Sequence, residues 1–249
     1  MENSALSLIT LNIWGGHLEA PLFDFFSSKK DVDIFCLQEV YCKAPRIITN
    51  EERYINRDVF SDIQSFLPEH QGFFRPIVKG IYGIGMFIKK GIEVLDEGGV
   101  LIHENKDYPG IGPTHSRSMQ YAKCSLGMRA FTLFNVHGLW NGKGKTDTPE
   151  RIEQSKKIKA FVDATMGPKI LCGDFNLTPE AESLRLLAEG MHDHVKFSGV
   201  GSTRTSYYPG SERFADYIFS TPDVETKSFE VLEDEVSDHA PLFFEFSMN

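Results

Sequence analysis

Six short segments of this chain each place a polar or charged residue at one end of an apolar run. The flanking residues favour β-strands, so the pattern predicts polar side chains at strand ends, where neighbouring strands can present them together. This feature constrains the fold, because the sheets must bring six distant segments to one place. The segments are residues 11–14, 37–40, 135–138, 173–176, 215–219 and 237–240.

Strands and helices alternate along the chain, with no polar linker long enough to divide it. The run 33–40 is almost continuously apolar, which fits a strand buried on both faces. Helices are expected where a threonine precedes proline, at Thr148-Pro149 and at Thr178-Pro179. Expected strands are 6–14, 33–40, 119–126, 130–136, 169–172, 214–220, 228–232 and 241–246, with shorter ones in 72–100; expected helices are 18–30, 51–67, 149–166 and 178–190.

The composition suits one domain covering residues 1–249. Hydrophobic residues make up 41% of the 249 residues, which is enough for a sizeable core. The mixed order of elements predicts an α/β or α+β fold with sheets at the centre and helices outside.

Charge and cysteine usage narrow the partners and the compartment. The net charge of −9 weighs against a nuclease that grips duplex DNA through a basic face, but not against a small phosphorylated substrate. The four cysteines form no Cys-x-x-Cys pair and are interpreted as reduced thiols. We expect a cytoplasmic protein without membrane insertion, because no signal peptide and no apolar run of ~20 residues is found. No protein partner is implied.

Glu39 ends a strand whose other residues are almost all apolar. A carboxylate there loses its hydration unless a cation or a donor meets it. Mg²⁺ takes oxygen ligands and combines one or two protein carboxylates with water and substrate phosphate. Asn12, at the end of another strand, can add an oxygen or position that carboxylate. The alternative is a buried glutamate bonded to backbone amides.

Asp174 and Asn176 follow the strand 169–172 and precede the helix expected at Pro179. The aspartate can orient or deprotonate a water molecule, and the asparagine amide can donate to a phosphoryl oxygen. The alternative is an Asx-turn that leads into a helix.

Two histidines are candidates for contact with a charged substrate. His239 follows Asp238 and precedes a strand, and Asp216, in an otherwise apolar strand, is a candidate to orient the imidazole. His137 ends the strand that begins near residue 131. For any one histidine, the alternative is a structural role in a loop.

Weaker candidates surround these segments. The guanidinium of Arg117 suits phosphate oxygens, although a surface ion pair is the alternative. The loop 141–147 carries glycines and lysines that can approach a phosphate, without the spacing of a nucleotide-binding P-loop. Tyr207 and Tyr208 can stack on a base or pack in the core.

In their order and in their residues, the six segments resemble the motifs of the endonuclease/exonuclease/phosphatase superfamily, the deoxyribonuclease I-like hydrolases. The similarity extends from residue 11 to residue 239. It implies a four-layer α/β/β/α sandwich of the α+β class, in which two packed, mainly antiparallel sheets are flanked by helices. It also implies a Mg²⁺- or Mn²⁺-dependent attack of water on a phosphoester.

The resemblance assigns a role to each candidate. Glu39 becomes the principal metal ligand, with Asn12 beside it and Asp238 near the metal. His137 and Asn176 become contacts to the scissile phosphate, and Arg117 becomes a further phosphate contact. Asp174 aligns or activates the water. His239, oriented by Asp216, acts as an acid/base or stabilises charge.

We therefore expect a metal-dependent phosphoesterase that hydrolyses a phosphodiester, with DNA or RNA as the first substrate class. The alternative within the same chemistry is a phosphatase or phospholipase C-type enzyme acting on an inositol phosphate or a phospholipid headgroup. A more distant alternative is a binding protein that keeps the fold without turnover.

Overall fold

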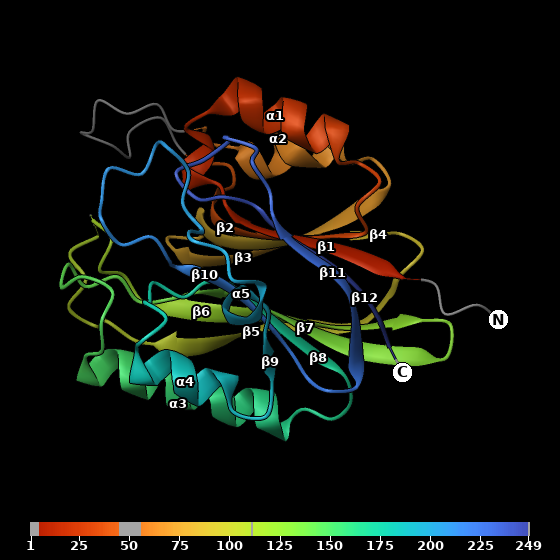
Figure 1. Ribbon diagram of the computed structural model, residues 1–249. Helices are drawn as coiled ribbons and strands as arrows, with labels where there is room; N and C mark the ends of the chain where they lie inside the picture. Colours follow the sequence, from red (N-terminus) through yellow and green to blue (C-terminus); the bar gives the residue numbers. More distant parts are fainter. Residues whose placement is uncertain (1–4, 45–55, 111, 249) are drawn as a thin grey trace.

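Two six-stranded β-sheets pack face to face, and helices cover the outer face of each sheet (Figure 1). The computed structural model describes residues 5–44, 56–110 and 112–248. The two ends of the chain share the first sheet, because β1 (Leu6–Asn12) lies between β12 (Leu242–Met248) and β2 (Ile34–Tyr41). This is the four-layer sandwich that the sequence predicts.

Each sheet is mainly antiparallel, as expected. The first has the order β11-β12-β1-β2-β4-β3, and the second has the order β5-β6-β7-β8-β10-β9. Among the described strands, the parallel pairs are β1–β2 and β7–β8. The other strands are β3 (His70–Val78), β4 (Tyr82–Lys89), β5 (Glu93–His103), β6 (Arg117–Leu126), β7 (Arg129–His137), β8 (Lys169–Asp174), β9 (His192–Asp193), β10 (Asp216–Ser220) and β11 (Val224–Val231).

The helices form the two outer layers. Helices α1 and α2 lie over the first sheet, and α3 and α4 lie over the second (Figure 1). No helix in the described part of the chain is long and apolar enough to cross a membrane. The helices are the 3-10 helix η1 (Trp14–Gly16), α1 (Glu19–Ser28), α2 (Val59–Phe66), α3 (Pro149–Ala164), α4 (Glu182–Ala188) and α5 (His194–Ser198).

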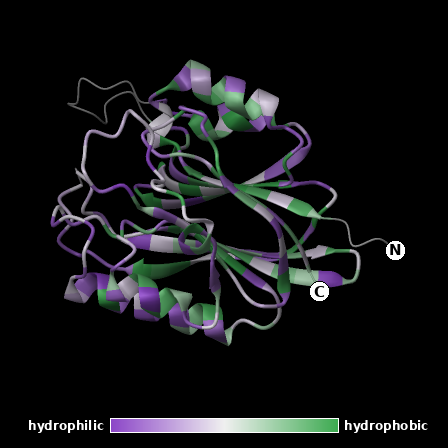
Figure 2. Cartoon of the chain, viewed as in Figure 1, coloured by the Kyte–Doolittle hydropathy of each residue, from purple (hydrophilic) through white to green (hydrophobic). Residues whose placement is uncertain are grey.

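Alternate residues of the first sheet face different layers. Leu8 and Ile34 join the core between the two sheets, whereas Ile9 and Phe35 join a second core beneath α1 and α2. Figure 2 shows hydrophobic residues on the strands in the middle of the molecule and mixed residues on the outer helices. The apolar run that begins at residue 33 is therefore a strand buried on both faces, as predicted.

The helix expected from Thr178 begins later than the sequence suggests. Helix α4 begins at Glu182, because the carboxylate of Asp147 accepts the backbone N–H groups of Glu182 and Ser183 over 2.7 and 2.9 Å. The cap therefore comes from a distant residue, and the expected cap at Thr178 is wrong.

The helix expected at 51–67 is also shorter than predicted. Helix α2 covers Val59–Phe66, and residues 56–58 precede it without helical structure. Residues 51–55 of that prediction lie outside the described residues.

Gly173 lets β7 and β8 approach each other closely. Its φ is 135°, which glycine adopts far more readily than other residues, and a Cβ there would lie 2.1 Å from the carbonyl oxygen of Val136. The pair Val136–Gly173 directly precedes the pair His137–Asp174 in the parallel ladder. This backbone contact therefore fixes the spacing of the polar side chains at the strand ends.

We expect Gly173→Ala to lower the free energy of unfolding by more than about 3 kcal/mol, since both the clash and the backbone strain must be relieved. Gly127→Ala is the matched control, because φ is also positive there (63°) but no atom lies within 4 Å of the added Cβ. That variant should lose only about 1 kcal/mol. Urea denaturation followed by circular dichroism measures both losses, and equal losses would contradict the close-contact account.

Candidate active site

Three buried polar side chains lie in one row across the second sheet. His137 at the end of β7 pairs with Asp174 at the end of β8, and Asp174 pairs with Asp216 at the start of β10. The expected strand 214–220 thus begins two residues late, which places Asp216 at a strand end. The register of three neighbouring strands therefore brings together residues that are far apart in the sequence.

Glu39 does not end its strand, as the sequence suggests, because β2 continues to Tyr41; it reaches the site from the first sheet through a bulge within β2. The register of β2 against β4 shifts between Leu37 and Val40, and Glu39 has a φ of 58°. Such backbone strain in a non-glycine residue is common at functional positions. Within the bulge, Gln38 is fully buried, whereas the Glu39 side chain is 30% exposed. The bulge thus sends the two neighbours into different surroundings.

Gln38 and Asn135 connect the two sheets beneath the site. The Gln38 amide donates to Oδ1 of Asn135 over 2.7 Å. The Asn135 amide donates to the carbonyls of Leu37 and Gly85 over 3.1 and 3.2 Å. No site role is predicted for either residue from the sequence, although an amide within an otherwise apolar strand is the signal that could have found them.

Asn12 links carboxylates of the two sheets. Its Nδ2 donates to Oε1 of Glu39 over 3.3 Å and to Oδ2 of Asp174 over 3.0 Å. Its Oδ1 accepts the backbone N–H of Trp14 over 3.0 Å. The amide therefore faces the carboxylates while the oxygen is already engaged. Of the two roles expected for Asn12, this geometry favours positioning of a carboxylate over ligation of a metal.

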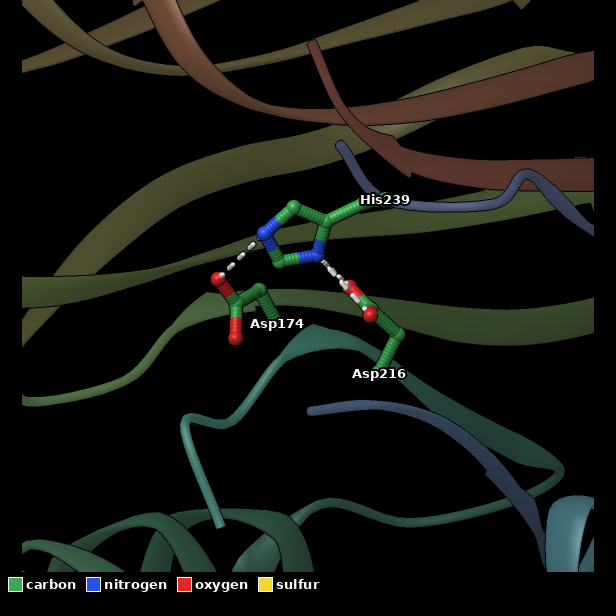
Figure 3. A group of neighbouring side chains, drawn as sticks. All are labelled: Asp174, Asp216 and His239. Atoms are coloured by element: carbon green, nitrogen blue, oxygen red, sulfur yellow. Dashed lines mark hydrogen bonds and ion pairs between the residues drawn. The ribbon is translucent and has the colours of Figure 1, made fainter. Parts of the chain in front are cut away.

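His239 is held between two aspartates (Figure 3). Its Nδ1 lies 2.8 and 2.9 Å from the two oxygens of Asp216, and its Nε2 lies 3.7 Å from Oδ2 of Asp174. Burial, helped by the charge of Arg204, lowers the pKa of His239 to about 3, so the imidazole is neutral at pH 7. Because Asp216 accepts the proton on Nδ1, Nε2 presents a lone pair toward Asp174.

Crowded carboxylates give the site the character of a cation site. Burial, together with the charges of Asp238 and Asp174, raises the pKa of Glu39 to about 7. Burial also raises the pKa of Asp216 to about 6. Carboxylates that repel one another in a buried place are the oxygen donors that Mg²⁺ and Mn²⁺ prefer. The residues therefore fit a divalent cation.

A different set of possible ligand atoms is the most compact one. One oxygen each from Asp174 and Asp216 and one ring nitrogen of His239 lie within 4.8 Å of one another. The hydrogen bond between His239 and Asp216 already satisfies part of this set. Of the carboxylates expected near the metal, Glu39 accepts a hydrogen bond from Asn12, and Asp238 is paired with Arg204.

Asp174 forms an Asx-turn after β8, because its Oδ1 accepts the backbone N–H of Asn176 over 2.9 Å. The side-chain amide of Asn176 donates to the carbonyl of Gly138 over 3.3 Å and keeps a second N–H. The Asx-turn of the alternative is therefore present, but it does not lead directly into a helix, since α4 begins at Glu182. Nε2 of His137 lies 3.8 Å from Glu39 and 3.9 Å from Asp174, too far for a hydrogen bond to either.

Three buried cations border these carboxylates. Arg117 and Lys145 are each 2% exposed, and the Arg204 side chain is 3% exposed. Arg204 donates to Asp238 over 3.2 Å. Among the described residues, no hydrogen-bond partner is found for Nε and Nη1 of Arg117, Nζ of Lys145 or Nε of Arg204. These N–H groups are available to an anion.

The sequence predicts these cations unequally. Arg117 is a candidate, and Lys145 lies in the loop 141–147, for which a phosphate contact is considered. Arg204 is missed, because nothing in the polar run 202–206 distinguishes it from a surface arginine. Tyr208 packs against Arg204, with the guanidinium carbon 4.1 Å from the ring centroid, while Tyr207 is 45% exposed.

The structure brings all the predicted site residues to one end of the sandwich. Arg117 belongs to the group because its charge acts on Glu39, Asp174 and His137. The residues joined by these contacts and charges are Asn12, Glu39, Arg117, His137, Asp174, Asn176, Asp216, Asp238 and His239.

We expect Glu39 to make the metal-free protein less stable as the pH rises. Its pKa is higher in the folded chain than its ordinary value of 4.5, so its contribution is complete below pH 4.5 and is lost as the pH rises from there to about 7. Partial exposure reduces the loss to about 1–2 kcal/mol. Thermal denaturation in EDTA at pH 5 and pH 8 should show this loss in the wild type but not in Glu39→Gln. A parallel pH response of the two proteins would refute the assignment.

Comparisons with solved structures agree with this architecture. An endonuclease/exonuclease/phosphatase family protein from Bacteroides thetaiotaomicron matches at 20% identity with a TM-score of 0.76, covering 100% of both chains. A mannosyl-6-phosphatase from the same species matches at 21% identity with a TM-score of 0.73, over 98% of this chain and 100% of that one. The human Nocturnin catalytic domain matches at 17% identity with a TM-score of 0.71, over 98% of this chain and 95% of that one.

At these identities the structural matches show the fold alone. No curated protein matches the chain in sequence. The model of the Endonuclease/Exonuclease/phosphatase family matches residues 9–239, which include every predicted site residue. Members of this family are hydrolases that act on phosphoesters and generally depend on divalent metals. With its sandwich fold and its polar strand ends, the chain belongs to the endonuclease/exonuclease/phosphatase family.

Proposed function

We propose that this chain is a divalent-metal-dependent phosphoesterase. The observation that carries the proposal is the meeting of crowded carboxylates and buried, unpartnered cations in one site. The carboxylates suit a metal ion, and N–H groups without partners suit phosphoryl oxygens. A site for a neutral substrate requires neither.

The balance of charge within the site explains the need for a metal. The imidazoles of His137 and His239 are neutral, because burial lowers the pKa of each. The carboxylates therefore outnumber the cations, and an anionic substrate is repelled until a divalent cation binds. The carboxylates are Glu39, Asp174, Asp216 and Asp238, and the cations are Arg117, Lys145 and Arg204.

Glu39 and Asp238 are the residues that we assign to the metal, which is Mg²⁺ or Mn²⁺ by the chemistry of its donors. Asn12 positions the Glu39 carboxylate from one side. When bound, the ion offsets the negative charge of the phosphoryl oxygens. The Asp238 carboxylate is held by Arg204, which fixes its direction.

Asp174 and His239 are placed to hold the attacking water. Oδ2 of Asp174 and Nε2 of His239 are both acceptors, and at 3.7 Å apart they are close enough for one water beside the pair to donate to each. Asp216 keeps the His239 ring in the tautomer that this requires. We assign Asp174 to the orientation and deprotonation of the water, with His239 as its partner.

His137, Asn176 and Arg117 are the groups that we assign to the scissile phosphate. His137 pairs with Asp174 from the end of the neighbouring strand β7, and Asn176 lies in the turn that follows Asp174. The free N–H groups of Arg117 and the second amide N–H of Asn176 can donate to oxygens whose charge grows during the reaction.

We propose a compact phosphoester as the substrate, in preference to the nucleic acid expected first from the sequence. The cations that can meet phosphate are buried in the candidate site, and the whole chain carries a net charge of −9. A long nucleic acid strand draws its affinity from a basic surface. Tight, salt-sensitive binding of DNA or RNA would favour the nuclease instead.

We expect His239→Ala to reduce kcat by about 10²- to 10⁴-fold, since the water loses one of its two acceptors. His192→Ala is the control, because His192 is an exposed histidine that stacks on Phe197. Turnover is measured on a panel of sugar phosphates, inositol phosphates, a phospholipid headgroup and short oligonucleotides, with Mg²⁺, Mn²⁺ or Ca²⁺. Undiminished turnover in His239→Ala would remove the histidine from the mechanism.

We also expect EDTA to abolish turnover and Mg²⁺ to restore it. At a saturating concentration, near a hundred times Kd, Mg²⁺ should stabilise the wild type by about 2.7 kcal/mol. In Glu39→Gln this stabilisation should be lost, while Glu19→Gln, a substitution on the outer helix α1, should keep it. Thermal denaturation reports the effect without a substrate. An equal response to Mg²⁺ in the Glu39 variant would place the metal elsewhere.

A further inference from the structure

Lys145 contributes a positive charge to the site, but the proposed function assigns its ammonium group no contact with the metal, the water or the scissile phosphate. The residue is 2% exposed, and its Nζ has no hydrogen-bond partner among the described residues. Burial and the charge of Arg204 lower its pKa. The carboxylates of Asp174, Asp216 and Glu212 offset part of its charge, but a buried ammonium group without hydrogen bonds still costs free energy, which indicates that a ligand completes its surroundings.

Arg204 stands beside it in a similar condition. One terminal nitrogen is bonded to Asp238, but Nε has no partner among the described residues. The ring of Tyr208 contacts both cations, with Nζ of Lys145 5.0 Å and the guanidinium carbon of Arg204 4.1 Å from its centroid. Two positive groups that share one aromatic ring repel each other, and an anion between them relieves that repulsion.

The backbone on either side of Lys145 is held firmly. The fully buried guanidinium of Arg151 donates to the carbonyls of Gly144 and Thr146. The carbonyl of Lys145 itself accepts the N–H of Thr178 over 2.9 Å. The ammonium group is therefore carried by a fixed backbone, which is the property of a pre-organised binding site.

Lys145 and Arg204 lie toward a different part of the site from Arg117. Arg204 forms a backbone bridge with His239 and an ion pair with Asp238, and the charges of both cations act on Asp216. The charge of Arg117 acts on Glu39 and His137, and Asp174 lies between, because the charges of Lys145 and Arg117 both act on it. The scissile phosphate already has Arg117, His137 and Asn176 as proposed partners. Lys145 and Arg204 therefore remain for an anionic group elsewhere on the substrate.

We propose that Lys145 and Arg204, joined by Tyr208, form a second anion subsite, which binds a phosphoryl group other than the one that is hydrolysed. This inference rests on the proposed phosphoesterase function. The substrate class is a phosphoester with two phosphoryl groups. The second group belongs either to a small bisphosphate or to the next link of a short oligonucleotide.

Binding of two simple anions tests the subsite without any turnover. Isothermal titration calorimetry in excess Mg²⁺ compares orthophosphate with pyrophosphate. In the wild type, pyrophosphate should bind at least tenfold more tightly. Lys145→Met should lose this preference and keep its affinity for orthophosphate, Lys145→Arg should retain most of it, and Lys156→Met, which changes an exposed lysine of α3, should bind as the wild type does.

Thermal denaturation of the same variants separates ligand binding from a structural role. Removal of an unpartnered buried charge should leave the midpoint of Lys145→Met unchanged or raise it. A lowered midpoint, an equal loss of both anions, or a wild type with no preference for pyrophosphate would overturn the proposal. A Lys145-dependent preference for pyrophosphate without hydrolysis of any phosphoester would instead contradict the proposed function and still support the subsite.

Matched substrates then identify the source of the second phosphoryl group. Glucose 6-phosphate is compared with glucose 1,6-bisphosphate, and the dinucleotide TpT with the trinucleotide TpTpT. The member with two phosphoryl groups should have the higher kcat/KM in one pair, and Lys145→Met should lower that value about tenfold, mainly through KM. A preference in the sugar pair assigns a small bisphosphate, and one in the nucleotide pair assigns an oligonucleotide strand. A Lys145→Met variant with equal effects on both members of each pair would contradict the subsite.

Discussion

The hydrogen bond between Gln38 and Asn135 is the contact on which the site depends. The carboxylate of Glu39 comes from one sheet, and the row of His137, Asp174 and Asp216 comes from the other. Packing of apolar side chains tolerates small sliding movements between two sheets, whereas buried amides tolerate little displacement, because each lost bond leaves a polar group without water. The hydrogen bond between the two amides therefore sets the position of one sheet relative to the other. Asn12 forms a second connection between the sheets, because it donates to both Glu39 and Asp174.

Much of this arrangement is predictable from the sequence. The apolar runs that end in polar or charged residues indicate strands with polar ends. The family resemblance adds the sandwich fold and the expectation that the polar segments meet in one place. The helix at Glu182 is not predictable in this way, because its cap is supplied by Asp147, a residue that only the folded chain brings near. The importance of Arg204 is hidden for the same reason, since its burial depends on elements that are distant in sequence.

Backbone strain is concentrated where chemistry is proposed. Glu39 and Asn176 have positive φ values of 58° and 54°, and Gly173 has a φ of 135°. Each lies next to, or within, a segment that ends a strand of the site. The surrounding sheets must be stable enough to hold these conformations, and the cores on both faces of the first sheet supply that stability. The stability of the sheets therefore supports the strained backbone of the site.

Arg151 donates hydrogen bonds to the carbonyls of Gly144 and Thr146 and so ties the segment that carries Lys145 to α3. The residues proposed to select the substrate are therefore held separately from the residues proposed to catalyse the reaction. The row of strand-end residues is built by sheet register, but Lys145 is presented by a connection tied to α3. Exchange of that connection would change the proposed anion subsite while leaving the proposed reaction centre intact. Under these proposals, the fold combines a replaceable segment for substrate choice with a constant reaction centre.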